Sequence, residues 1–160
     1  MSDRFLSIAI DAAWDAMESG GGPFGAVVAR GDEVIAVGRN EAEPSHDPTA
    51  HAEVMAIRHA CRKIGTRDLA GCVLYASCYP CPMCLAAAYW ANLREIRFAV
   101  TEDEAARHGF DDEFIRLDLA LPSPKRRVLL RHVPVGGAER VMEEFSRRQG
   151  GYGGEPIGRP

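Results

Sequence analysis

The chain has 160 residues, of which 46% are hydrophobic and 26% are charged, and its formal net charge is −4. This size and balance are typical of one soluble globular domain, because roughly 70% of the unfolded surface can be buried at this length. The acidic balance gives no general attraction for polyanions, and no apolar run is long enough to span a bilayer. No secretory leader is evident at the amino terminus. We therefore expect a cytoplasmic protein that binds neither nucleic acid nor membranes.

The first half of the chain alternates between helical and extended patterns. Apolar residues recur at three- and four-residue steps over 3–19, which predicts an amphipathic helix that ends at three glycines. Two β-rich runs, 24–30 and 34–40, are separated by Gly31-Asp32-Glu33 and predict a hairpin. A polar loop follows over 41–48, and helical periodicity returns over 49–64.

The second half continues the alternation. Strands are predicted over 72–76, 95–100 and 127–135, and helices over 83–91, 111–119 and 137–149. This order predicts an α/β fold, one sandwich built around a single sheet. We expect a single domain over 1–149, followed by a glycine-rich tail over 150–160 that is mobile unless something holds it.

Two short motifs contain the residues that could bind a metal. Three of the five cysteines lie within seven residues, which indicates a metal site or a reactive thiol rather than a disulfide framework. His51-Ala52-Glu53 opens one predicted helix, and Pro80-Cys81-Pro82-Met83-Cys84 opens another. The combination H-x-E and P-C-x-x-C is similar to the signature of zinc nucleobase deaminases.

The spacing of these motifs suits an open zinc site. Cys81 and Cys84, three residues apart in a first helical turn, project to one side, and His51 adds a nitrogen from the neighbouring helix. Three protein ligands leave the fourth tetrahedral position for water, as catalytic zinc requires. Because two thiolates neutralise Zn²⁺, the ion should lower the pKa of its water less than it would with three neutral imidazole ligands. An adjacent base is therefore needed. We expect Glu53 to be that base.

The alternative is a closed structural site. If Cys78 also bound the ion, a Cys₃His set would fill the fourth position and leave Glu53 no water to activate. The protein would then be a zinc-structured binding module without activity. We favour Cys78 as a packed thiol, because it precedes the turn, and we treat Cys61 and Cys72 as small core residues.

Further segments extend the likeness beyond the zinc motifs. The chain contains GGPFGAVV (21–28), DPTAHAEV (47–54), SCYPCPMC (77–84), AAYWA (87–91) and GFDDEFI (109–115). With these segments it resembles the cytidine deaminase superfamily, and within it the bacterial guanine deaminases. The resemblance implies a three-layer α/β/α sandwich with a five-stranded mixed sheet. It also implies a homodimer with one Zn²⁺ per chain, which replaces an exocyclic amine by a carbonyl.

The resemblance also implies roles for individual residues. His51, Cys81 and Cys84 match the zinc ligands, Glu53 matches the proton shuttle, and Asp112 matches a second catalytic or recognition carboxylate. The positions that match or adjoin substrate contacts are Phe24, Asn40, Ala52, Tyr79, Trp90 and Tyr152. Phe24 and Trp90 could instead be core residues, Asn40 a turn residue and Asp112 a helix cap. Tyr152 makes the tail a candidate lid over the pocket.

The resemblance leaves the substrate open at one position. Many relatives have SCEPCPMC, whereas Tyr79 replaces that glutamate here, which removes a charge and adds bulk. We expect zinc-activated water to deaminate a free nucleobase, most like guanine, and to release ammonia. The alternatives are an aminopyrimidine, aminotriazine or modified purine such as cytosine, ammeline or isoguanine. A tRNA adenosine deaminase is disfavoured, because the basic clusters are short and the protein is acidic.

Overall fold

The computed structural model describes residues 2–149, with side chains from Arg4 to Arg148. Its elements group into two compact units, divided between Arg116 and Leu117, and each unit is described by itself. Among the described residues, no helix combines the length and apolar character needed to cross a bilayer.

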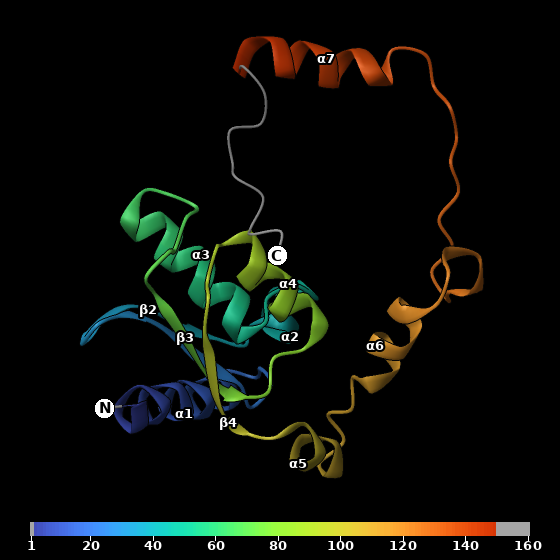
Figure 1. The fold of residues 1–160 in the computed structure, drawn as a ribbon. Coiled ribbons are helices and arrows are strands. Elements are labelled where there is room, and N and C mark those ends of the chain that lie inside the picture. Colours follow the sequence, from blue (N-terminus) through green and yellow to red (C-terminus); the bar gives the residue numbers. More distant parts are fainter. Residues whose placement is uncertain (1, 150–160) are drawn as a thin grey trace. The chain divides into compact units, whose positions relative to one another are not determined.

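The first unit is built on a mixed four-stranded sheet (Figure 1). Its strands are β1 (Gly25–Arg30), β2 (Glu33–Arg39), β3 (Val73–Cys78) and β4 (Ile96–Val100), in the order β2-β1-β3-β4. β1 pairs antiparallel with both β2 and β3, whereas β3 and β4 run parallel. The hairpin predicted for the first two strands is therefore confirmed.

Helices cover both faces of this sheet. The helix α1 (Ser2–Glu18) packs on one face, where Phe5 and Ala9 meet Val27 and Tyr75. The helices α3 (Ala52–Ile64) and α4 (Pro82–Trp90) cover the other face, where the alternate residues of β1 and β3 point. Because side chains alternate along a strand, burial on both faces explains the nearly continuous apolar runs of β1 and β3.

Three short helices complete the first unit. α2 (Ala42–Ser45) lies in the stretch predicted to be a loop, and α5 (Glu102–Arg107) was not predicted. α5 starts with a capping box in which Thr101 and Glu104 exchange hydrogen bonds. A threonine followed three residues later by a glutamate is the sequence pattern of such a cap. α6 (Glu113–Ala120) begins in the first unit and ends in the second.

The second unit contains the end of α6, a 3₁₀ turn (Ser123–Lys125) and α7 (Ala138–Gln149). The strand predicted over 127–135 is wrong, because these residues are irregular and pair with no strand in the described chain. Its apolar side chains remain exposed, with Val128 at 73% and Val133 at 72%, and Pro134 lacks the N–H that a ladder needs. The α/β fold class is confirmed, but the described sheet has four strands rather than five.

Candidate active site

Two helix N-termini bring the predicted metal ligands together. His51 is the N-cap residue of α3 and Cys81 the N-cap residue of α4, and neither side chain caps its helix. His51 Nδ1 lies 3.5 Å from Cys81 Sγ and 3.6 Å from Cys84 Sγ, and the two sulfurs are 3.5 Å apart. Pro82 occupies the first turn of α4, where its missing N–H leaves no helical bond unmade.

This cluster has the dimensions of a zinc site. With Zn–S bonds of about 2.3 Å and Zn–N bonds of about 2.0 Å, tetrahedral ligands lie roughly 3.5–3.8 Å apart. The observed separations agree, and these three ligand atoms form the only such group of histidine, cysteine and acidic residues found in the part of the chain that is described. Cys78 does not belong to that group, which supports three protein ligands rather than four.

The electrostatics of the cluster favour a thiolate. The hydrogen bond between Cys81 and Cys84 lowers the pKa of Cys81 to about 4, and His51 contributes in the same direction. The Cys81 thiolate in turn raises the pKa of Cys84, and its hydrogen bond raises the pKa of His51. The positive end of the α4 dipole also favours negative charge at these sulfurs.

Glu53 lies beside the cluster, on the first turn of α3. Only 7% of its surface is exposed, and burial raises the pKa of its carboxyl group above the ordinary value. A buried acid with a raised pKa keeps its proton to a higher pH than an exposed one, which suits a group that acts as both general acid and general base. Gly38 on β2 makes this placement possible, because a Cβ there would collide with the α3 backbone at Ala52 and Ala56.

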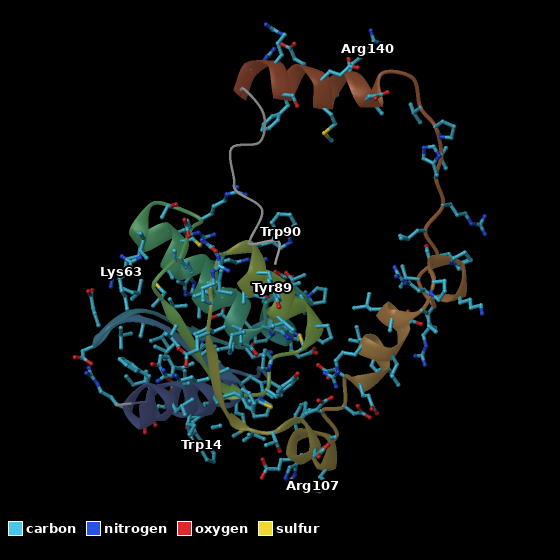
Figure 2. The ribbon with its side chains drawn as sticks, in the orientation of Figure 1. Trp14, Lys63, Tyr89, Trp90, Arg107 and Arg140 are labelled. Atoms are coloured by element: carbon cyan, nitrogen blue, oxygen red, sulfur yellow. The ribbon has the colours of Figure 1, made fainter. Side chains whose placement is uncertain are left out.

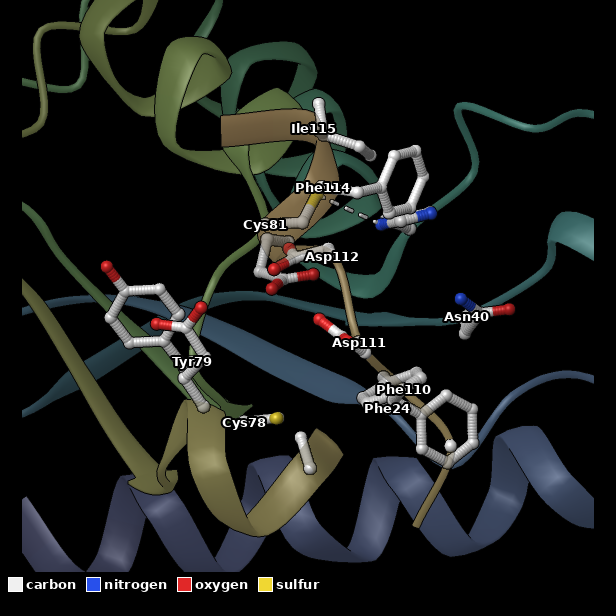
Figure 3. A pocket seen from close by; sticks show the side chains of 15 residues that line it. Phe24, Asn40, Cys78, Tyr79, Cys81, Phe110, Asp111, Asp112, Phe114 and Ile115 are labelled. Atoms are coloured by element: carbon white, nitrogen blue, oxygen red, sulfur yellow. Dashed lines mark hydrogen bonds between the residues drawn. The ribbon is translucent and has the colours of Figure 1, made fainter. Parts of the chain in front are cut away.

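The cluster and Glu53 open into a cavity of about 320 Å³ (Figure 3). It is lined by Phe24, Asn40, His51, Glu53, Cys78, Tyr79, Cys81, Glu102, Ala105, Gly109, Phe110, Asp111, Asp112, Phe114 and Ile115. The volume lies at the lower end of the range for small-molecule sites. Four carboxylates contribute to the lining, so the cavity attracts N–H donors and disfavours phosphate groups.

Asn40 has a fixed orientation at one end of the cavity. Its Oδ1 accepts hydrogen bonds from the backbone N–H groups of Gly22 and Ala42, each 3.2 Å long. The amide oxygen is therefore used by the protein, and the Nδ2 group is left to donate to a ligand. This arrangement combines the turn role and the binding role that the sequence left as alternatives.

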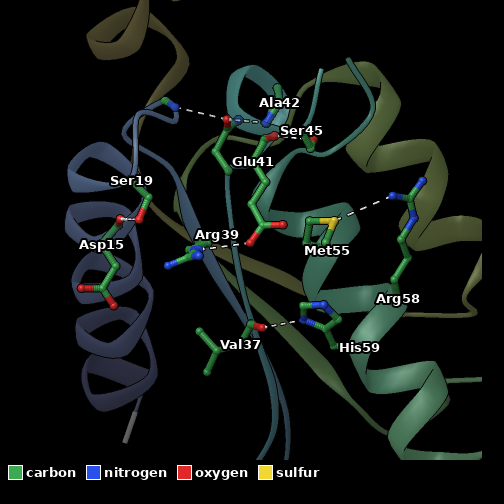
Figure 4. Close-up of polar contacts among 12 residues, drawn as sticks. Asp15, Ser19, Val37, Arg39, Glu41, Ala42, Ser45, Met55, Arg58 and His59 are labelled. Atoms are coloured by element: carbon green, nitrogen blue, oxygen red, sulfur yellow. Dashed lines mark hydrogen bonds and ion pairs between the residues drawn. The ribbon is translucent and has the colours of Figure 1, made fainter. Parts of the chain in front are cut away.

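Polar contacts also hold the segment that joins Asn40 to His51 (Figure 4). Arg39 Nε pairs with Glu41 Oε1 at 3.1 Å, and Ser45 Oγ donates to the Glu41 carbonyl. Arg58 of α3 contacts Asp47 and Thr49, which precede the expected metal ligand His51. These contacts position the entrance to α3.

Aromatic rings form one wall, and not all of them were predicted. Phe24 packs edge-on against Phe110, with ring centroids 4.9 Å apart. Asp112, which the resemblance matches to a second carboxylate, lines the cavity, and so does Tyr79, the position at which the chain departs from the family pattern. Sequence reasoning missed Glu102, Phe110, Asp111, Phe114 and Ile115, most of which lie in the GFDDEFI segment that carried the resemblance.

The structure does not bring every expected contact to the cavity. Trp90 is 73% exposed and does not line it (Figure 2). It is the last residue of α4, whereas the ligands lie at the first turn, and nine helical residues span roughly 13 Å. Ala52 is fully buried against β2 and does not line the cavity either, and Tyr152 lies outside the described residues.

A His-Cys-Cys cluster and a buried glutamate at two helix N-termini, beside an α/β sheet, form an arrangement that is typical of the zinc nucleobase deaminases. The chain matches the family model described as "Cytidine and deoxycytidylate deaminase zinc-binding region" over residues 1–100. It therefore belongs to the cytidine and deoxycytidylate deaminase family.

Individual relatives agree with this family. The chain is 46% identical to guanine deaminase of Bacillus subtilis (strain 168) over 127 residues, which cover 79% of this chain and 81% of that protein. The X-ray structure of guanine deaminase from Bacillus subtilis superposes with a TM-score of 0.83, at 39% identity and 96% coverage of both chains. A tRNA-specific adenosine deaminase of Aquifex aeolicus (strain VF5) is 33% identical over 91% of this chain and 94% of that protein.

Proposed function

We propose that the chain is a zinc-dependent aminohydrolase that deaminates free guanine, releasing ammonia. The observation that carries the proposal is the His51, Cys81 and Cys84 cluster, with buried Glu53 beside it at the base of one cavity. The 46% identity to a guanine deaminase supports the choice of base.

Glu53 performs the proton transfers in this reaction. A Zn²⁺ held by His51, Cys81 and Cys84 would supply a Lewis acid that polarises a water molecule, although two thiolate ligands would weaken that effect and leave the proton transfer to Glu53. A Glu53 carboxylate oxygen receives a proton from the attacking water and delivers it to a ring nitrogen beside the amine-bearing carbon. The carboxylate next takes the proton of the newly added hydroxyl group and passes it to the departing amine, so that ammonia leaves and a carbonyl remains.

The cavity walls support a purine base as the substrate. Asn40 Nδ2 can donate to a ring or carbonyl acceptor, while Asp111 and Asp112 can accept from N–H groups. Guanine carries both kinds of group on opposite edges. The rings of Phe24 and Phe110 offer apolar surface for stacking.

The proposal also covers the location, the partners, the zinc content and the oligomeric state of the enzyme. The expected cytoplasmic location is supported by five cysteines that form no disulfide. Exclusion of nucleic acid is supported by the net charge of −4 and by the carboxylates in the cavity. We retain one Zn²⁺ per chain and a homodimer as parts of this proposal.

Ammonia release from a panel of amines tests the proposal. The zinc-loaded protein is assayed with guanine, isoguanine, adenine, cytosine, ammeline and the matching nucleosides, and with a tRNA anticodon stem-loop. We expect guanine to give the highest kcat/KM, with Glu53→Gln as the inactive control. If another base gives a higher kcat/KM, that base and not guanine is the substrate. Activity on the stem-loop alone would overturn the proposal of a free base.

A further inference from the structure

One side of the cavity is supplied by a segment that has little core of its own. Residues 109–115, here called the pocket wall, contribute six of the fifteen lining residues. No side chain of α6 is buried, and Phe110 and Phe114 are 45% and 48% exposed. Apolar burial is the main source of order in a folded chain, so this wall depends on other contacts for its position.

Arg116 follows the wall directly and joins three separate elements. Its guanidinium forms ion pairs with Glu102 at the start of α5 and with Asp112, the latter between Nη1 and Oδ1 at 3.1 Å. It also lies over the ring of Tyr79, 5.7 Å from the centroid. All three partners line the cavity, whereas Arg116 does not.

The chemistry of the guanidinium suits this arrangement. Its planar fork can serve two carboxylates at once while one face rests on an aromatic ring, which a lysine ammonium cannot reproduce. Glu102 and Asp112 would otherwise repel each other across a small cavity. The side chain of Arg116 is 31% exposed, so these pairs are only partly screened by water.

Tyr79 is itself held in place on its other side. Its ring packs edge-on against Phe98 of β4, with centroids 5.2 Å apart. The contact with Arg116 therefore connects the wall to the sheet through a residue of the turn between β3 and Cys81.

We propose that Arg116 is a positioning residue, which fixes the pocket wall and aims the Asp112 carboxylate into the cavity through its contacts with Glu102, Asp112 and Tyr79. The proposal rests on the proposed function, because the wall then forms part of the site that binds the base. Loss of Arg116 should weaken substrate binding more than it slows the chemical step, since the metal ligands and Glu53 lie on other elements.

The test compares Arg116→Ala and Arg116→Lys with the control Arg107→Ala, which removes an exposed arginine from the neighbouring α5. For Arg116→Ala we expect KM for guanine to rise roughly tenfold while kcat changes less than about twofold. Arg116→Lys should recover part of that KM, because an ammonium can still pair with one carboxylate. Zinc content should match the wild type in all three variants.

Hydrogen–deuterium exchange of the peptide covering the wall provides a readout that needs no activity. We expect it to exchange at least about threefold faster in Arg116→Ala, with peptides from α3 and α4 unchanged. Wild-type exchange in Arg116→Ala, or a loss confined to kcat, would overturn the positioning role. If the wild-type protein releases no ammonia from any base, the proposed function fails, while the exchange result still decides how the wall is held.

Discussion

The two sides of the cavity are held by different means. On the metal side, His51, Glu53 and Cys81 lie at helix N-termini that rest on a buried sheet face, and Cys84 is fully buried. On the other side, most of residues 109–115 are exposed, and their contacts include the ring pair of Phe24 and Phe110 and the ion pair of Asp112 with Arg116.

This difference separates the residues that carry out the reaction from those that select the substrate. A proton shuttle must be placed accurately, and packing against a sheet gives that accuracy because interiors are close-packed. A substrate wall without a core can change at little cost to stability. We therefore expect substitutions on the metal side to remove activity, and substitutions on the wall to change the affinity for substrate and the choice of base.

The strongest test of the metal side is the pair Cys84→Ser and Cys78→Ser. Cys84→Ser replaces a thiolate ligand and should abolish both zinc binding and measurable turnover. Cys78→Ser alters a neighbouring buried thiol outside the ligand group and should retain one zinc per chain. Zinc content by atomic absorption and kcat with guanine measure the outcome. Loss of zinc in Cys78→Ser would mean four protein ligands, and the open site would be wrong.

Glu53→Gln comes next, because it removes the proton carrier and leaves the ligands untouched. We expect kcat to fall by about 10³- to 10⁴-fold with zinc content unchanged. Burial raises the pKa of Glu53, so a neutral amide is at least as well tolerated there as a carboxylate, and the melting temperature should not fall. Kinetics and thermal melting at pH 7 check both statements. An active Glu53→Gln enzyme would refute the mechanism.

The sequence predicts the metal side well because its geometry is local. His51 and Glu53 are two residues apart, and Cys81 and Cys84 share one helical turn, so short-range spacing determines which atoms converge. Placing the two helix N-termini side by side requires the sheet, and the β-rich and short apolar runs predicted its four described strands, although the strand predicted over 127–135 is wrong.

The positions of the pocket wall and of Trp90 could not be predicted from local spacing. Helical spacing does not tell whether a ring faces a cavity, and Trp90 lies at the far end of its helix from the ligands. The run over 127–135 is rich in apolar residues, but a strand forms only where a partner accepts its hydrogen bonds. Arg116 has no signal of its own, because its partners Glu102 and Tyr79 are distant in sequence.

Asn40→Ala probes the junction between the two sides. It removes both the ligand donor and the acceptor that holds Gly22 and Ala42, so kcat/KM should fall by roughly 10- to 100-fold. Asn40→Asp keeps the acceptor and loses the donor. We expect Asn40→Asp to have the melting temperature of the wild type. Its kcat/KM should be as low as that of Asn40→Ala. Equal activity of Asn40→Asp and wild type would contradict the donor role of Nδ2.

Phe110→Ala tests the wall alone. It removes the edge contact with Phe24, and a ring pair contributes about 0.5–1.5 kcal/mol beyond its burial. We expect KM for guanine to rise about three- to tenfold with kcat nearly unchanged, measured in the same assay. Phe145→Ala, in α7, is a control for removing a half-exposed ring outside the cavity lining. A fall in kcat as large as that of Glu53→Gln would remove the distinction between the two sides.

Glu104→Gln has the smallest expected effect and acts only through the start of α5. Hydrogen bonds from the Thr101 backbone N–H and hydroxyl hold the pKa of Glu104 below its ordinary value. A lowered pKa means that the carboxylate stabilises the fold above the unfolded-state pKa, and that this contribution is lost as the pH falls through the folded-state pKa. Glu104→Gln should therefore melt slightly below the wild type at pH 7, and the difference should close as the pH falls through the lowered folded-state pKa of Glu104. Asp103→Asn, outside the capping box, should show no such convergence, and kcat and KM at pH 7 should be unchanged in both variants if α5 keeps Glu102 in place.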